Sequence, residues 1–217
     1  GAYVPAILDT GVRKTHDAID HVTWSDQVCL DTAQAANNPD PADSTSADVN
    51  GHGTHMAGIV VSDYYDFPTL YRGLARDTAE ALNLKAAYDL DNVDGGPAMM
   101  YWSDMMDCAD WALTHTGGGD PHADVFNLGY TACVTETQDD SPAARFWDAV
   151  VDDQLVPAAI PAGNYTDGIT CTRYVGDPGI AYNVITVGNV NDTGDASSST
   201  PNRDDDTINP TSAWGET

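Results

Sequence analysis

The sequence predicts an α/β fold, in which a three-layer arrangement places helices on both faces of a parallel sheet. Three observations predict it. Short apolar runs recur along the chain, several are separated by segments with helical spacing, and most end in a turn or polar residue. This alternation is typical of parallel strands joined by right-handed crossovers. The length of 217 residues suits a single domain over residues 1–217 with a substantial core.

Apolar runs mark the expected strands. The first run ends in Leu8-Asp9-Thr10-Gly11 and therefore delivers Asp9 at the carboxyl end of a buried strand. Open α/β sheets place their ligand sites at this end of the strands. The expected strands lie at residues 3–12, 81–87, 123–129, 155–160 and 183–190, and residues 211–215 are expected to begin one more.

Helical spacing appears between these runs. Residues 99–114 carry apolar side chains on one helical face, and residues 141–154 are expected to form another helix. The expected buried face of the first helix is Met99, Trp102, Met106, Ala109 and Leu113. A small-residue apolar stretch after His55 is expected to pack closely as a helix, and residues 31–50 are interpreted as a surface loop.

The composition is strongly acidic. The chain has 34 acidic residues, of which 31 are aspartate, against 8 Lys and Arg, and its formal net charge is −26. A nucleic-acid partner is disfavoured because phosphate binding needs clustered Lys and Arg. No apolar run is long enough to span a membrane. Adaptation to high salt, calcium binding by Asp-rich loops, and a plain acidic surface all remain open.

Four cysteines occur, at Cys29, Cys108, Cys133 and Cys171. None forms a C-x-x-C pair, so a zinc knuckle or thioredoxin motif is unsupported. An even number in a secreted protein allows two disulfides with three possible connectivities, and the alternative is a set of buried free thiols.

Three segments share a resemblance to one family. They are Leu-Asp-Thr-Gly around Asp9, the box Asn-Gly-His-Gly-Thr-His-Met-Ala-Gly around His52, and Ala-Gly-Asn ending at Asn164. In this order they resemble the subtilisin family of serine proteases. The resemblance implies that His52 is the general base and that Asp9 fixes its tautomer. It also implies that Asn164 donates to the oxyanion.

The same resemblance implies a substrate cleft. Asn127, Leu128 and Gly129 would pair with the substrate and form one pocket wall, with Asn127 in place of the family's serine. Ala162 and Gly163 would line the other wall, and residues 95–100 the opposite edge of the cleft.

Disulfide pairing and calcium also follow from the resemblance. A Cys133–Cys171 disulfide would tie the two pocket walls together, leaving Cys29–Cys108 as the second pair. The family often holds structural calcium, and the Asp-rich loop 89–96 is a weak candidate. No cofactor is required for the chemistry, and other metal ligands stay unknown.

The family's nucleophile box, of the Gly-Thr-Ser-Met-Ala type, is missing. Ser212 lacks the preceding glycine and is expected to lie in the strand before that box. The fold is therefore expected to be incomplete at the C-terminus, with the serine on a bound C-terminal fragment beyond residue 217. The implied function is a secreted serine endopeptidase that cleaves proteins through an Asp-His-Ser triad and an acyl-enzyme. The alternative is a non-catalytic subtilisin-like binding or scaffold module that has lost the serine.

Overall fold

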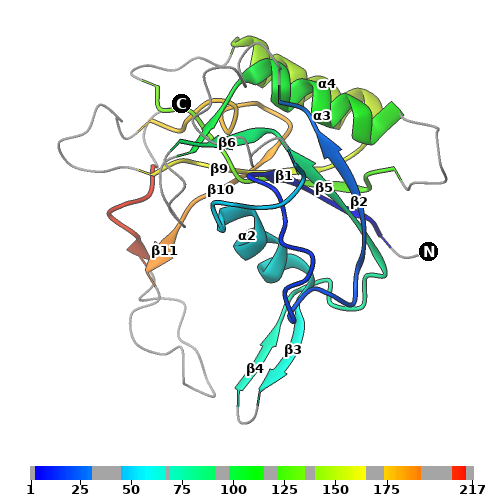
Figure 1. The fold of residues 1–217 in the computed structure, drawn as a ribbon. Coiled ribbons are helices and arrows are strands. Elements are labelled where there is room, and N and C mark those ends of the chain that lie inside the picture. Colours follow the sequence, from blue (N-terminus) through cyan, green and yellow to red (C-terminus); the bar gives the residue numbers. More distant parts are fainter. Residues whose placement is uncertain are drawn as a thin grey trace. The chain divides into compact units, whose positions relative to one another are not determined.

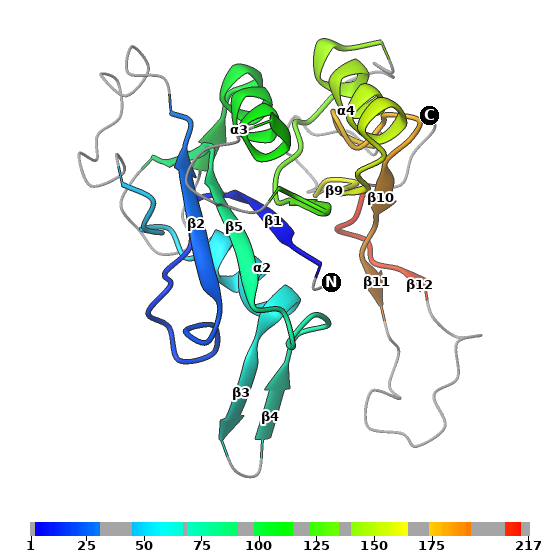
Figure 2. The ribbon, with the colours of Figure 1, turned by 90° about the vertical axis from the view of Figure 1, so that its right-hand side faces the viewer.

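The computed structural model describes residues 3–30, 45–66, 69–90, 98–114, 122–134, 140–164, 174–191 and 207–213. The chain divides into two compact units. Figures 1 and 2 show the helices and strands from two directions. The first comprises residues 1–129 with 156–158, and the second residues 130–155 with 159–217. Within the described residues, no helix is both long and apolar enough to cross a lipid bilayer.

A parallel sheet forms the centre of the first unit. Its strands follow the order β8 (Val125–Leu128), β1 (Pro5–Asp9), β5 (Glu80–Lys85) and β2 (Thr23–Val28). Helices α2 (His52–Val61) and α3 (Trp102–Thr114) lie on opposite faces of these strands (Figure 1). The parallel sheet between helices confirms the predicted α/β fold.

Burial explains which strands the sequence revealed. Strand β1 is buried along its whole length, and its Ile7 packs in one cluster with Ala57 and Val61 of α2. Strand β2 is half-exposed and polar, so its sequence, Thr-Trp-Ser-Asp-Gln-Val, carries no apolar run, and the sequence analysis missed it. Two antiparallel hairpins were also missed, β3 (Asp63–Asp66) with β4 (Thr69–Arg72) and β6 (Ala87–Asp89) with β7 (Ala98–Met100).

The predicted helix at 99–114 begins three residues later and turns a different face inward. Met99 and Met100 belong to strand β7, and α3 starts at Trp102. Its buried residues are Asp104, Met105, Cys108, Ala109 and Ala112, so only Ala109 of the expected face is fully buried. Polar and covalent contacts select this face, because Tyr88 donates a hydrogen bond to Asp104 and Cys108 is covalently bonded.

The second unit contains α4 (Pro142–Gln154), the parallel strands β9 (Ala158–Pro161) and β10 (Ile185–Val187), and the antiparallel pair β11 (Val190–Asn191) and β12 (Thr207–Ile208). Ser141 caps α4 by accepting the Ala144 N–H at 2.9 Å. The strand expected at 155–160 starts only at Ala158, since Leu155 takes a left-handed conformation that ends α4. The strand expected at 183–190 is divided into β10 and the start of β11.

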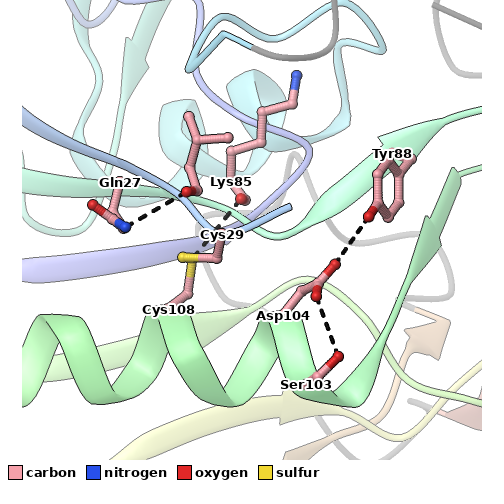
Figure 3. The surroundings of a disulfide bond; sticks show 8 residues. Gln27, Cys29, Lys85, Tyr88, Ser103, Asp104 and Cys108 are labelled. Carbon is pink, nitrogen blue, oxygen red and sulfur yellow. Dashed lines mark hydrogen bonds between the residues drawn. A yellow bond between two sulfur atoms is a disulfide. The ribbon is translucent and has the colours of Figure 1, made fainter. Parts of the chain in front are cut away.

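A disulfide joins Cys29, just after β2, to Cys108 of α3 within the first unit (Figure 3). The two Cα atoms are 5.6 Å apart and the residues are separated by 79 positions. Cys133 is also disulfide-bonded, and Cys171, the partner expected for it, lies outside the described residues.

Removing the Cys29–Cys108 disulfide is expected to lower the free energy of unfolding by about 3 kcal/mol, because the bond limits the freedom of the unfolded chain. The Cys29→Ala/Cys108→Ala double variant tests this in a urea titration. A stability within about 0.5 kcal/mol of the parent, the range of most surface changes, would contradict it.

Candidate active site

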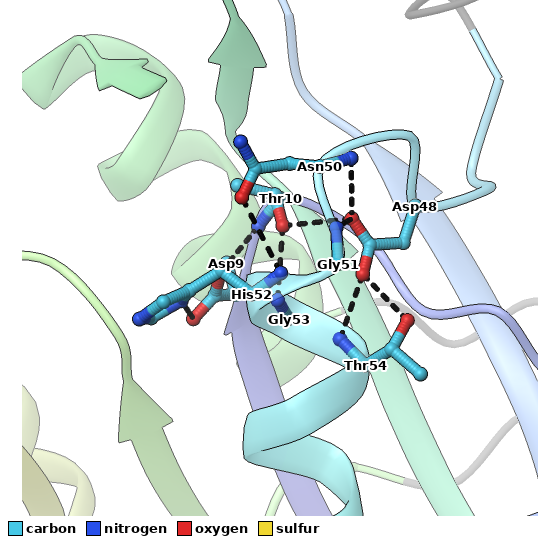
Figure 4. A network of polar contacts seen from close by, with 8 residues as sticks. All are labelled: Asp9, Thr10, Asp48, Asn50, Gly51, His52, Gly53 and Thr54. Carbon is cyan, nitrogen blue, oxygen red and sulfur yellow. Dashed lines mark hydrogen bonds and ion pairs between the residues drawn. The ribbon is translucent and has the colours of Figure 1, made fainter. Parts of the chain in front are cut away.

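Asp9 and His52 face each other at the carboxyl end of β1 (Figure 4). The Nδ1 atom of His52 lies 2.8 Å from Oδ1 and 3.0 Å from Oδ2 of Asp9. The Asp9 carboxylate is only 3% exposed, whereas the side chain of His52 is 48% exposed. One ring nitrogen is therefore held by a buried carboxylate, and the half-exposed ring keeps its Nε2 atom for a second partner.

The acceptor role of Asp9 fixes the imidazole tautomer. A carboxylate can only accept, so Nδ1 of His52 must carry a proton, and in the neutral ring Nε2 is then unprotonated. Asp9 is itself held by the Thr10 N–H, which donates to Oδ1 at 2.7 Å. The pair thus presents a basic nitrogen with its lone pair free to accept a proton, which is what a general base requires.

Helix α2 begins in a dense set of side-chain hydrogen bonds. The first N–H groups of a helix have no partner within the helix and need other acceptors. The N–H of His52 donates to Asn50 Oδ1 at 3.3 Å, that of Gly53 to Thr10 Oγ1 at 2.9 Å, and that of Thr54 to Asp48 Oδ2 at 2.8 Å. These bonds fix the start of the helix, and therefore the backbone of His52, relative to β1.

Asp48 is the site residue that sequence reasoning missed. Its buried carboxylate accepts hydrogen bonds from the Thr10 hydroxyl, from the backbone of Asn50 and Gly51, and from both the backbone and the hydroxyl of Thr54 (Figure 4). The segment before it is tied to β5, because Lys85 donates to the carbonyl oxygen of Ala47 at 2.8 Å. The position of Asp48 four residues before His52, next to the first helical turn, was the available signal.

Two glycines allow the close approach of these elements. A Cβ atom on Gly53 would lie 2.2 Å from the carbonyl oxygen of Gly11, so only glycine lets α2 pack this closely against the chain after β1. A Cβ atom on Gly129, just after β8, would lie 1.6 Å from Oδ2 of Asp9 and 3.3 Å from Cε1 of His52. Gly129 therefore leaves the space that the Asp9–His52 pair occupies.

Asn127 and Leu128, the other predicted residues of this pocket wall, lie in β8. They pair in parallel register with Ile7 and Leu8 of β1, and the Gly129 N–H donates to the carbonyl oxygen of Leu8 at 3.0 Å. Strand β8 thus brings Asn127, Leu128 and Gly129 next to the carboxyl end of β1, where Asp9 lies.

The predicted residues Ala162, Gly163 and Asn164 follow β9 in the second unit. Asn164 is exposed, and its backbone bridges that of Ser212 in antiparallel fashion. Gly163 has a φ of 110°, a left-handed conformation that favours glycine. Ser212 is buried in an isolated bridge outside any described strand; its N–H donates to the carbonyl oxygen of Asn209 at 2.8 Å, and its hydroxyl accepts the Asn189 N–H at 2.9 Å.

No metal site emerges from the described ranges, in which no three His, Cys, Asp or Glu side chains are grouped to bind an ion. Most of the loop 89–96 proposed for calcium lies outside these ranges. The calcium site expected from the resemblance therefore stays a prediction.

The pKa of His52 is raised above its ordinary value. The main cause is the hydrogen bond to Asp9, and the negative charges of Asp9 and Asp48 add to it, while partial burial opposes it. Asp9→Asn is expected to lower the pKa of His52, measured by NMR titration of the imidazole carbons. Asp77→Asn, a change at a 93% exposed carboxylate, is the control and should leave the pKa unchanged.

This shift also sets a pH dependence of folding stability. Because the folded-state pKa of His52 lies above the unfolded value, protonated His52 stabilises the fold. This contribution is complete below about pH 6.5 and is lost as the pH rises through the folded-state pKa. Comparison of melting curves of the parent and Asp9→Asn across this range checks the sign, since the difference should shrink at higher pH.

Comparison with known proteins places this geometry in a family. A model of the subtilase family of peptidases matches residues 2–213, nearly the whole chain. The chain belongs to the subtilase family. Serine protease AprX of Bacillus subtilis (strain 168) is 29% identical over 173 residues, which are 78% of this subtilase and 35% of AprX. The chain thus spans about a third of that relative's length.

Solved structures agree on the fold of this subtilase. MycP1 with its N-terminal propeptide removed has a TM-score of 0.64 at 19% identity, over 99% of this chain and 61% of that one. The prenylagaramide maturation protease PagA has a TM-score of 0.62 at 17% identity, over 99% of this chain and 59% of that one. These likenesses support the subtilisin-like fold predicted from the sequence.

Proposed function

We propose that Asp9 and His52 of this subtilase are the acid–base pair of a serine endopeptidase. The observation that carries the proposal is the bond between Nδ1 of half-exposed His52 and the buried Asp9 carboxylate. This bond leaves Nε2 of His52 as the proton acceptor. The second support is that the chain belongs to the subtilase family of peptidases.

In the proposed reaction, a serine hydroxyl attacks the carbonyl carbon of a peptide bond as its proton passes to Nε2 of His52. Asp9 stabilises the resulting imidazolium without itself becoming protonated. His52 then returns the proton to the leaving amine nitrogen, the C–N bond breaks, and an acyl-enzyme remains. Water repeats these steps with His52 as base, and this releases the acid and restores the serine.

The side-chain amide of Asn164 is proposed as a donor to the oxyanion of the tetrahedral intermediate. Exposed Asn164, next to a glycine with a left-handed φ, is compatible with this role. The backbone of residues 127–129, with Ala162 and Gly163, is proposed to bind the peptide substrate by strand pairing.

The nucleophile is proposed to come from a segment outside residues 1–217. The sequence contains no Gly-Thr-Ser-Met-Ala box, and the hydroxyl of buried Ser212 is engaged by Asn189 and Ala213. Secretion belongs to the same proposal, and the Cys29–Cys108 disulfide supports it because such bonds persist in oxidising compartments.

Intact-mass analysis after treatment with a fluorophosphonate tests this function. We expect an adduct on a co-purifying peptide, with His52→Ala slowing labelling by at least about 10³-fold. His21→Gln, a change at an exposed histidine whose Nε2 lies 3.3 Å from the Arg76 carbonyl oxygen, is the control and should label like the parent. An adduct on Ser212 would move the nucleophile into this chain. No adduct on any peptide would favour the non-catalytic binding module.

A further inference from the structure

A cavity with a volume of about 630 Å³ lies beside α2 in the first unit. Neither Asp9 nor His52 is among the described residues that line it. Its walls come from the segment after β1, from α2 and from the end of β4, and include Arg13, His16, Ile19, His55, Ile59 and Arg72. A cavity of this size matches the range of about 300–1,000 Å³ that small-ligand sites occupy.

The charge of this cavity is opposite to that of the chain. The chain has 34 acidic residues and only 8 Lys and Arg among 217 residues. Yet the described lining contains two arginines and two of the six histidines, and no Asp or Glu. A cluster of cationic and donor groups in a concave site attracts anions locally, even on a protein of opposite net charge.

The donors of the cavity suit a carboxylate. Arg72 uses its Nε atom for Asp63 at 3.2 Å, so the two terminal amino groups are not committed to that bond. His16 accepts the Ala18 N–H at Nδ1, which places the proton of the neutral ring on Nε2 as a donor. Arginine recognises planar carboxylates through paired N–H groups.

The remaining walls are apolar or open. Ile59 is 50% exposed although it is a large aliphatic residue, and Ile19 forms part of the buried core beside it. A Cβ atom on Gly58 would meet no heavy atom within 4 Å, so a side chain there could enter free space. The cavity therefore offers apolar surface next to its cationic groups.

We propose that this cavity binds a carboxylate that carries an aliphatic group, either as a free small acid or as an Asp side chain within a peptide. Binding in this cavity does not depend on the protease function, because neither Asp9 nor His52 lines it and no serine nucleophile is needed. The two sources share the same chemistry and differ in the size of the ligand.

Binding is measured by NMR chemical-shift titration of the protein, with the His16 and His55 imidazole signals as reporters. The probes are 3-methylglutarate, acetyl-Ile-Asp-amide and its neutral match acetyl-Ile-Asn-amide. We expect saturation with a dissociation constant on the order of 1 mM for at least one carboxylate probe and no saturation by the neutral match. The carboxylate probe that binds more tightly shows whether the ligand is a free small acid or an Asp side chain within a peptide.

Variants distinguish binding inside the cavity from a general effect of removing a positive charge. Arg72→Gln is expected to weaken binding about tenfold, because a charge-assisted contact is lost. Gly58→Leu should abolish binding by filling the cavity. Arg76→Gln, which removes the same charge from an arginine outside the lining, is the control and should bind like the parent. Equal losses for Arg72→Gln and Arg76→Gln, or equal binding of the Asn peptide, would overturn the proposal.

Discussion

Replacing Gly129 by alanine is expected to separate Asp9 from His52. The new Cβ atom would lie 1.6 Å from Oδ2 and 2.7 Å from Cγ of Asp9, so the carboxylate must move. The Asp9 carboxylate is buried and bonds both His52 and the Thr10 N–H, so its displacement disturbs these bonds. We expect the pKa of His52 to fall towards its ordinary value. Fluorophosphonate labelling should slow by about 10⁴-fold, the loss that follows an incorrect imidazole tautomer.

The matched control is Gly188→Ala. The nearest atom to a Cβ there is the Ser212 hydroxyl oxygen at 3.4 Å, an ordinary contact. This variant should keep the labelling rate and the His52 pKa of the parent. Thermal melting separates the effect on the pair from unfolding, since overpacking alone costs about 1–3 kcal/mol. A normal His52 titration in Gly129→Ala would show that the chain relaxes without moving Asp9, contrary to our expectation.

Asp48→Asn is expected to lower the free energy of unfolding by about 3–5 kcal/mol, because a buried acceptor of several hydrogen bonds becomes a partial donor. An amide nitrogen placed at Oδ2 would face the backbone N–H and hydroxyl of Thr54, and one placed at Oδ1 would face the donors of Thr10, Asn50 and Gly51. The pKa of His52 should also fall, since the charge of Asp48 helps to raise it.

Urea unfolding and NMR titration measure these two effects separately. The control is Asp77→Asn, for which we expect a stability change below about 1 kcal/mol because exposed ion pairs contribute little. A stable Asp48→Asn protein with a lowered His52 pKa would limit Asp48 to an electrostatic role. An unchanged pKa in a destabilised protein would limit it to holding the helix start. Parent values for both would contradict the role we assign to this carboxylate.

The sequence predicted the parts of the fold that depend on local pattern. Buried β1 is an apolar run, β5 carries Ala81, Leu82 and Leu84, and Ser141 caps α4 where helical spacing began. Strand β2 could not be predicted in this way, because a half-exposed strand needs no apolar run. The inward face of α3 was predicted wrongly because the contact between Tyr88 and Asp104 joins residues of different elements.

The same limit applies to the site. Asp9 and His52 stood in recognisable motifs, and the family model supports the fold that brings them together. Asp48 sat in a polar stretch that resembled any solvated loop. Its burial depends on Asn83 and Lys85 of β5, which bind the carbonyl oxygens of Ser46 and Ala47. Such pairings across more than 35 positions leave no periodic trace in the sequence.

The absence of side chains at Gly53 and Gly129 has a consequence for transplanting this pair onto other scaffolds. Asp9 lies between these two residues, and a single methyl group at either would occupy space that the backbone or the carboxylate now fills. A designer who copies only the aspartate and the histidine onto a parallel sheet would omit the empty volume that lets them meet. A transplanted pair therefore needs at least these two glycines as well as the aspartate and the histidine.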